Sequence, residues 1–214
     1  MKNKFTLLLM MLFCCVATQS FAQIEYGVKA GLNFSTLIDK DNDGAVTENS
    51  STKTGFHIGF TAEYSFTDKF AFESGLLYSS KGTNSRYTDS GTTYKETLNL
   101  NYLEIPLNAV YKIELGNKKV LLKAGPYLGF AFSGKYIYDD GSSDKVNIGS
   151  DRNNDEIKAL DFGLNFGAGI GIKSYTLGLQ YEFGLANISP DTSNGYKISN
   201  SVFGISLGYK FGGK

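Results

Sequence analysis

The stretch LDFGLNFGAGIGIKSYTLGLQYEFGL, residues 160–185, decides the fold of this chain. Apolar residues occupy every second position from Leu160 to Ile172 and again from Tyr175 to Leu185, and polar residues or glycines fill the positions between them. A period of two is typical of β-strands with one apolar face. A two-residue turn at Lys173-Ser174 pairs Ile172 with Tyr175, which places both apolar sets on the same face.

Six further segments repeat this pattern, so the sequence predicts eight strands in all. The six segments are residues 24–34, 56–66, 70–78, 103–113, 120–132 and 203–211. Each is about as long as the 9–11 residues that a tilted strand needs to cross a bilayer. Tyr102 precedes a break in the alternation, which predicts a bulge there, and we also expect bulges at Pro106 and Pro126.

The connections between the predicted strands alternate strictly between short and long. Tight turns are predicted at Thr67-Asp68-Lys69, Gly116-Asn117 and Lys173-Ser174. Longer polar links are predicted at residues 35–54, 80–96, 133–156 and 187–197. One rim therefore carries turns and the other carries loops, as in outer-membrane barrels with periplasmic turns and extracellular loops.

Residue size indicates which face of the sheet lies outside. Glycines recur on the polar face, and the interior of a narrow barrel gives a steric reason for them, because inward side chains converge. The bulky apolar face is then the outer one, which only lipid can cover. We therefore predict an all-β, eight-stranded antiparallel up-and-down transmembrane β-barrel with a packed, charged interior and an aromatic girdle near the turns. A soluble lipocalin-type barrel is the alternative. The predicted girdle residues are Tyr64, Phe66, Phe70, Phe72, Tyr111, Tyr175, Tyr209 and Phe211.

The N-terminal segment reads as a targeting sequence. Lys2 and Lys4 precede an apolar run that ends near Ser20-Phe21-Ala22, so we predict a signal peptide over residues 1–22 and a barrel domain over residues 23–214. Both cysteines, Cys14 and Cys15, lie in that segment, and Phe13 does not suit a lipoprotein signal. Without the two lysines the chain has 19 basic and 21 acidic residues, a net charge of −2, which gives no basic excess for nucleic acid.

Two features carry possible chemistry, but neither justifies assigning a catalytic, cofactor-binding or metal-ligating residue. His57 lies on a polar strand face without a nucleophile motif, and a satisfied interior side chain is its simpler interpretation. Asp39, Asp41 and Asp43 with Gly44 match the opening half of a calcium-binding EF-hand loop. Ser50 stands where that loop needs a glutamate, so a solvated acidic loop is the simpler interpretation.

Several short motifs resemble the outer-membrane β-barrel domain family common in Bacteroidetes, which includes PorT-like proteins. The motifs are residues 70–78 (FAFESGLLY), 102–107 (YLEIPL), 125–129 (GPYLG) and 161–164 (DFGL). The resemblance implies a small barrel of the OmpA and OmpX kind, located in the outer membrane after export. It implies little about activity, because a fold does not determine a function.

We therefore expect a non-enzymatic outer-membrane protein without cofactors that acts in surface interaction or envelope structure. The alternatives are an accessory role in protein secretion, as in PorT-like proteins, and a lipid-modifying membrane enzyme. The expected partners are outer-membrane lipid, the outer-membrane assembly machinery and an extracellular or envelope molecule.

Overall fold

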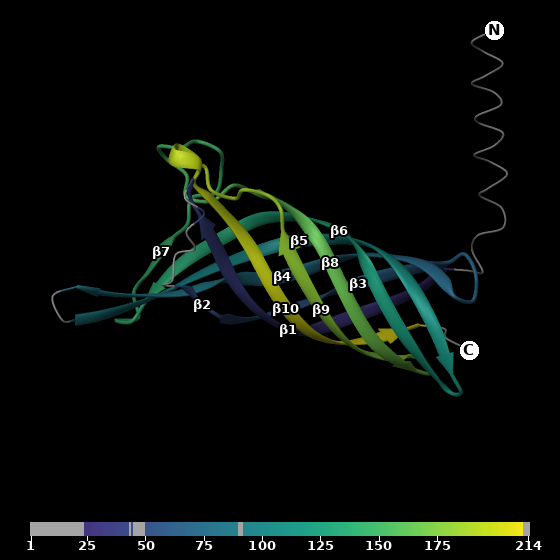
Figure 1. Cartoon of the computed structure of the whole chain (residues 1–214). Helices are drawn as coiled ribbons and strands as arrows, with labels where there is room; N and C mark the ends of the chain where they lie inside the picture. Colours follow the sequence, from purple (N-terminus) through teal and green to yellow (C-terminus); the bar gives the residue numbers. More distant parts are fainter. Residues whose placement is uncertain (1–23, 43, 45–49, 90–91, 212–214) are drawn as a thin grey trace, which may run out of the picture.

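The computed structural model describes residues 24–42, 44, 50–89 and 92–211. The predicted signal peptide and both cysteines lie outside these residues. Figure 1 shows one elongated barrel of inclined strands. The elements are β1 (Ile24–Lys40), β2 (Ser50–Ser51), β3 (Lys53–Ser65), β4 (Phe70–Asp89), β5 (Thr92–Leu115), β6 (Lys118–Tyr138), β7 (Ser143–Lys145), β8 (Leu160–Ile172), β9 (Tyr175–Gly184), the 3-10 turn η2 (Ser193–Gly195) and β10 (Lys197–Lys210).

Eight of the strands close into a ring, which confirms the predicted fold class. Each of these strands pairs antiparallel with its neighbours in chain order, except for the extra short strands β2 and β7. The ring closes where β1 pairs antiparallel with β10, with Ala30 opposite Leu207. A closed ring satisfies the backbone hydrogen bonds of every strand without leaving an edge in the membrane-spanning part.

The registers at the tight turns are those predicted from the apolar pattern. Ile172 lies opposite Tyr175, and Ile113 lies opposite Val120. Gly116 adopts φ +63° in its turn, a conformation that glycine reaches without strain. The three tight turns lie at one rim of the barrel, toward the right of Figure 1. The start of β1 and the end of β10 lie at the same rim.

The prediction of a loop at residues 80–96 is wrong, because residues 80–89 and 92–96 continue β4 and β5 as a two-stranded hairpin. Thr88 still lies opposite Thr93 near its tip. The outer part of this hairpin, which we call the projecting hairpin and define as residues 86–89 and 92–95, extends beyond the other strands at the left of Figure 1. β1 and β6 also run further than predicted, to Lys40 and Tyr138.

The irregularity predicted near Tyr102 is confirmed, whereas the expected bulges at the two prolines are wrong. The β5–β6 register shifts between Asn101 and Tyr102. Pro106 lies opposite Tyr127 and Pro126 opposite Leu164 without a shift in register, although the β4–β5 pairing is interrupted at Pro106 and the β5–β6 pairing at Pro126. A proline omits only one donor, and the ladder tolerates that omission without inserting a residue.

The bulky apolar face lies outside and the polar face inside, as predicted. Phe60 is 71% exposed and Leu207 57% exposed, whereas Glu63, on the opposite face of β3, is 1% exposed. Rings of the predicted girdle contact one another: Phe70 lies 5.0 Å from Tyr111 and Tyr175 lies 5.1 Å from Tyr209, between ring centroids. Among the described residues, no helix is long and apolar enough to cross a membrane.

Candidate functional site

The barrel interior is the most structured polar region of the chain, and its half near the turns contains alternating ion pairs. Lys112 Nζ lies 2.6 Å from Glu63 Oε1, and Lys210 Nζ lies 2.8 Å from the same atom. Lys210 also reaches Glu25 at 2.9 Å. These residues come from β1, β3, β5 and β10, so ion pairs connect strands that are not neighbours in the ring.

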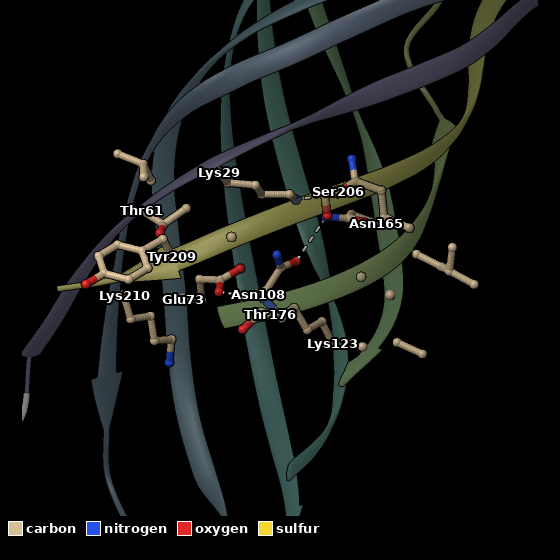
Figure 2. Close-up of a pocket in the computed structure, with 18 residues that line it drawn as sticks. Lys29, Thr61, Glu73, Asn108, Lys123, Asn165, Thr176, Ser206, Tyr209 and Lys210 are labelled. Carbon is tan, nitrogen blue, oxygen red and sulfur yellow. Dashed lines mark hydrogen bonds and ion pairs between the residues drawn. The ribbon is translucent and has the colours of Figure 1, made fainter. Parts of the chain in front are cut away.

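A cavity of about 50 Å³ lies next to these pairs (Figure 2). Lys123 pairs with Glu73 at 2.5 Å on one side of it. On the other side Lys29 donates to the side-chain oxygen of Gln180, a neutral acceptor. Glycines Gly167, Gly169, Gly178 and Gly208 also line the cavity, which explains why space remains in so narrow a barrel.

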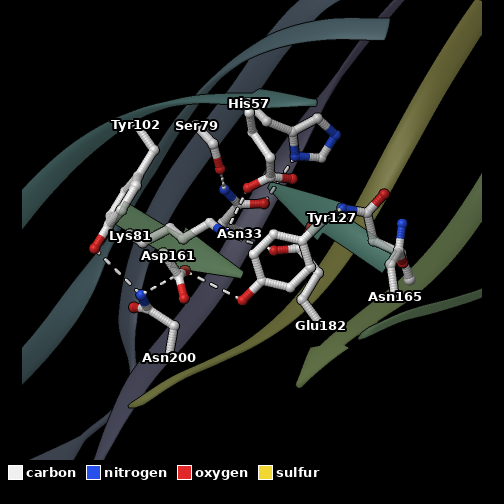
Figure 3. A network of polar contacts seen from close by, with 12 residues as sticks. Asn33, His57, Ser79, Lys81, Tyr102, Tyr127, Asp161, Asn165, Glu182 and Asn200 are labelled. Carbon is white, nitrogen blue, oxygen red and sulfur yellow. Dashed lines mark hydrogen bonds and ion pairs between the residues drawn. The ribbon is translucent and has the colours of Figure 1, made fainter. Parts of the chain in front are cut away.

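A second charged group lies closer to the loops, centred on Lys81 (Figure 3). Lys81 Nζ lies 2.5 Å from Glu104 and 2.8 Å from Glu182, and all three side chains are at most 2% exposed. The rings of Tyr127 and Tyr102 lie 4.6 and 5.4 Å from the ammonium, within cation–π range. Lys81 therefore binds two carboxylates and two aromatic faces at once.

Asp161 adds a third buried carboxylate to the Lys81 group. Its Oδ2 accepts hydrogen bonds from Tyr127 at 3.1 Å and from Asn200 at 2.9 Å. Asn200 also donates to Tyr102 at 3.2 Å. The group thus combines one ammonium with three carboxylates, and phenol and amide donors stabilise the surplus negative charge.

His57 lies buried near this group. It is 1% exposed, and its Nδ1 lies 2.8 Å from Asn33 Oδ1. The side-chain amide of Asn33 donates to Ser79 at 3.0 Å, so the imidazole Nδ1 carries the proton and donates to Asn33. Asn33 and Ser79 therefore hold His57 through its Nδ1, whereas its buried Nε2 has no hydrogen-bond partner among the described residues.

Loops close the barrel end above the Lys81 group. An apolar cluster there combines strand residues with loop residues, and its members are Leu37, Leu98, Leu100, Tyr102, Ala131, Val146, Ile157, Ala186 and Ile188. Arg152 bonds Asp191 at 3.0 Å between two loops. Hydrogen bonds from the Ser193 hydroxyl and backbone hold the pKa of Asp191 below its usual value. The loops therefore form a packed cover over the barrel.

The solvated acidic loop expected around Asp39, Asp41 and Asp43 stays a prediction. Asp39 lies near the end of β1 opposite Ile198, and Asp43 lies outside the described residues. In the described part of the chain, no three acidic, histidine or cysteine side chains are grouped so that they could hold a metal ion. In another acidic loop, Asp151 accepts hydrogen bonds from Asn153 and Asn154, which lower its pKa.

Sequence reasoning placed most of the interior charges but missed Lys81. Glu104, Asp161 and Glu182 stand at polar positions of the alternating segments 103–113 and 160–185, and the structure brings these three together around Lys81 and Tyr127. Lys81 was placed in a loop, whereas it is a fully buried strand residue that pairs opposite Leu100. The out-of-phase residues Leu98 and Leu100 were the signal that the sheet continues past residue 80.

Comparisons with solved structures give alignments with small outer-membrane barrels. The attachment invasion locus protein Ail of Yersinia pestis is 14% identical, with 88% of this chain and 99% of that chain covered and a TM-score of 0.43. Neisserial surface protein A is 15% identical, with coverage of 87% and 97% and a TM-score of 0.44. The outer membrane protease OmpT from Escherichia coli is 13% identical, with coverage of 88% and 97% and a TM-score of 0.42.

The family assignment comes from the sequence and from the strand pairing described above. No curated protein matches the sequence. The family described as outer membrane protein beta-barrel domain matches residues 18–189, about four fifths of the chain. Together with the closed ring of eight strands and the apolar outer face, this match shows that the chain belongs to the outer membrane protein beta-barrel domain family and lies in the outer membrane.

Proposed function

We propose that this protein is a non-enzymatic outer-membrane barrel whose projecting hairpin binds a partner outside the cell. The observation that carries the proposal is the hairpin itself, which continues β4 and β5 beyond the loop-bearing rim (Figure 1). By the usual orientation of these barrels, long loops and extended strands face outward and tight turns face the periplasm.

Two tyrosines near the tip of the hairpin support a role for the hairpin in binding a partner. Tyr87 and Tyr94 lie opposite each other and stack, with ring centroids 5.1 Å apart and planes inclined by 17°. They are 53% and 40% exposed. Rigid, exposed aromatic side chains supply contact area at low entropic cost, and they are enriched in interfaces.

The interior supports a structural rather than a catalytic role. Ion pairs connect Lys81 with Glu104 and Lys112 with Glu63, and His57 bonds an amide instead of a nucleophile. A general base needs a substrate within hydrogen-bond reach, and the loop cover stands over this region. The PorT-like secretion role remains an alternative that no observation in this fold favours.

Cross-linking on intact cells tests the proposal. A photo-reactive residue at position 94 should yield a defined adduct with an extracellular or envelope molecule, and Tyr87→Ser should reduce that adduct because it removes the stacked ring. The same photo-reactive residue at Tyr175, on the turn-bearing rim, is the control. If cells show no adduct at position 94 but lose envelope integrity on deletion of the protein, its role is structural. Co-purification of secretion components would instead support the secretion role.

A further inference from the structure

The turn-bearing rim contains a hollow that none of the functions above uses. Its volume is about 330 Å³, and it is lined by the turn residues Gly116, Asn117 and Lys173. Because these turns face the periplasm in an outer-membrane barrel, the hollow opens on the periplasmic side. We call it the periplasmic vestibule.

Lysines dominate the lining of the vestibule. Lys112, Lys119, Lys173 and Lys210 all line it, against the single carboxylate of Glu25. Acidic residues Asp68 and Glu114 line a neighbouring hollow of about 350 Å³ and not this one. The positive side of the rim is therefore the side that carries Lys173.

The ion pairs neutralise the inner lysines of the vestibule but not the outer ones. Lys112 and Lys210 bind Glu63 deep in the barrel, at 2.6 and 2.8 Å. Lys119 reaches Glu114 only at 3.5 Å, with both side chains more than half exposed, and such a pair is weak. Among the described residues Lys173 forms no salt bridge. Two ammonium groups at the mouth thus remain available to a ligand.

The vestibule adjoins the 50 Å³ cavity of Figure 2, because Thr176 and Lys210 line both hollows. Lys29, which donates a hydrogen bond to the neutral side chain of Gln180, lies at this inner cavity. Further inward, the buried Lys81 group and the apolar loop cluster occupy the barrel. A ligand therefore enters and leaves by the turn-bearing rim.

We propose that the periplasmic vestibule binds a phosphate-type oxyanion, with Lys119 and Lys173 as its outer donors. Ammonium groups are strong donors to such oxygens, and the volume accommodates a phosphate or a phosphorylated head group rather than a whole lipid. Free phosphate and a phospholipid head group of the inner leaflet share this chemistry. Electrostatic capture of this kind weakens with added salt.

Calorimetric titration of the refolded full-length barrel with inorganic phosphate tests the proposal. In nanodiscs of phosphatidylcholine, Lys119→Gln with Lys173→Gln should weaken phosphate binding by about fivefold or more, since each exposed ammonium contributes modestly. The matched control is Lys135→Gln with Lys145→Gln, which removes the same charge from β6 and β7 on the opposite rim. This control should bind phosphate as the native protein does.

Two further measurements test whether the ligand is free phosphate or a lipid head group, and whether it binds inside the vestibule. Adding phosphatidylglycerol to the nanodiscs should compete with phosphate if a lipid head group occupies the site, and should leave binding unchanged if free phosphate is the ligand. Gly171→Val fills the vestibule without altering its charge, because a Cβ there meets its nearest neighbour only at 3.7 Å. It should weaken binding while the protein stays folded. Absence of phosphate binding, or equal binding by the Lys119/Lys173 variant, would overturn the proposal and leave the hairpin-based function untouched.

Discussion

Removing the ammonium of Lys81 is the sharpest perturbation of the barrel interior. Lys81→Met keeps most of the side-chain volume but breaks ion pairs of 2.5 and 2.8 Å to Glu104 and Glu182. Both carboxylates are at most 2% exposed, so they are left buried without a counter-charge. Breaking a buried pair in this way costs about 3–5 kcal/mol. The lost cation–π contact with Tyr127 adds to that cost in the same direction.

A triple variant distinguishes the cost of leaving buried charges unpaired from the cost of lost packing. Lys81→Met with Glu104→Gln and Glu182→Gln removes the whole ionic group, and neutral replacements of such groups are often tolerated. We expect the triple variant to recover at least half of the stability lost in Lys81→Met. Urea unfolding in lipid vesicles measures the free energy of unfolding of both variants. The folded fraction is read from the band of the folded protein on a gel run without heating. A cost below about 1 kcal/mol for Lys81→Met, or equal costs for the two variants, would refute the reasoning.

Three further predictions address the outer face, the backbone and the last strand. Leu179 is half exposed on the outer face of β9, so Leu179→Arg should destabilise the barrel by about 2–4 kcal/mol in vesicles. Asn165 faces inward, so Asn165→Ser should cost much less. Equal costs would mean that the faces are assigned the wrong way round. Gly82 has φ +131°, and a Cβ there would lie 1.9 Å from the Leu98 carbonyl oxygen. Gly82→Ala should therefore lower the refolding yield. Gly208→Ala should not, because a Cβ at Gly208 would lie 3.7 Å from its nearest neighbour. Tyr209→Ser with Phe211→Ser should slow assembly in a pulse-chase membrane assay more than Tyr26→Ser with Val28→Ser, because the final strand closes the ring; similar rates would deny it a special role.

The membrane-spanning part of the fold was predictable because lipid imposes a strict pattern on it. From Leu160 to Gly184 each residue faces either lipid or the interior, so alternation and turn length determine strand and register together. The same reasoning failed for the projecting hairpin. Arg86 and Lys95 face each other there in solvent, where both sheet faces can be polar, and no alternation marks the strands.

The interior charges were predictable as a set, but their pairing was not. Glu104 and Glu182 follow the alternation of their own strands, yet their common partner Lys81 comes from a third strand, β4, which pairs with the strand of Glu104 and lies across the barrel from the strand of Glu182. Only ring closure brings these side chains together, and it also decides that Lys112 and Lys210 share Glu63. Sequence periodicity describes one strand at a time and contains no information on such contacts.

A scan along one strand in a bilayer tests most directly whether this chain spans a membrane with its bulky face in lipid. Spin labels are placed singly at positions 175–184 of β9, and their collisions with oxygen, which concentrates in lipid, are measured in reconstituted vesicles. The account predicts high collision rates at Leu177, Leu179, Tyr181 and Phe183, which face outward, and low rates at Gly178, Gln180 and Glu182, which face the packed interior. Uniform rates along the strand, or high rates at the second set of positions, would contradict it.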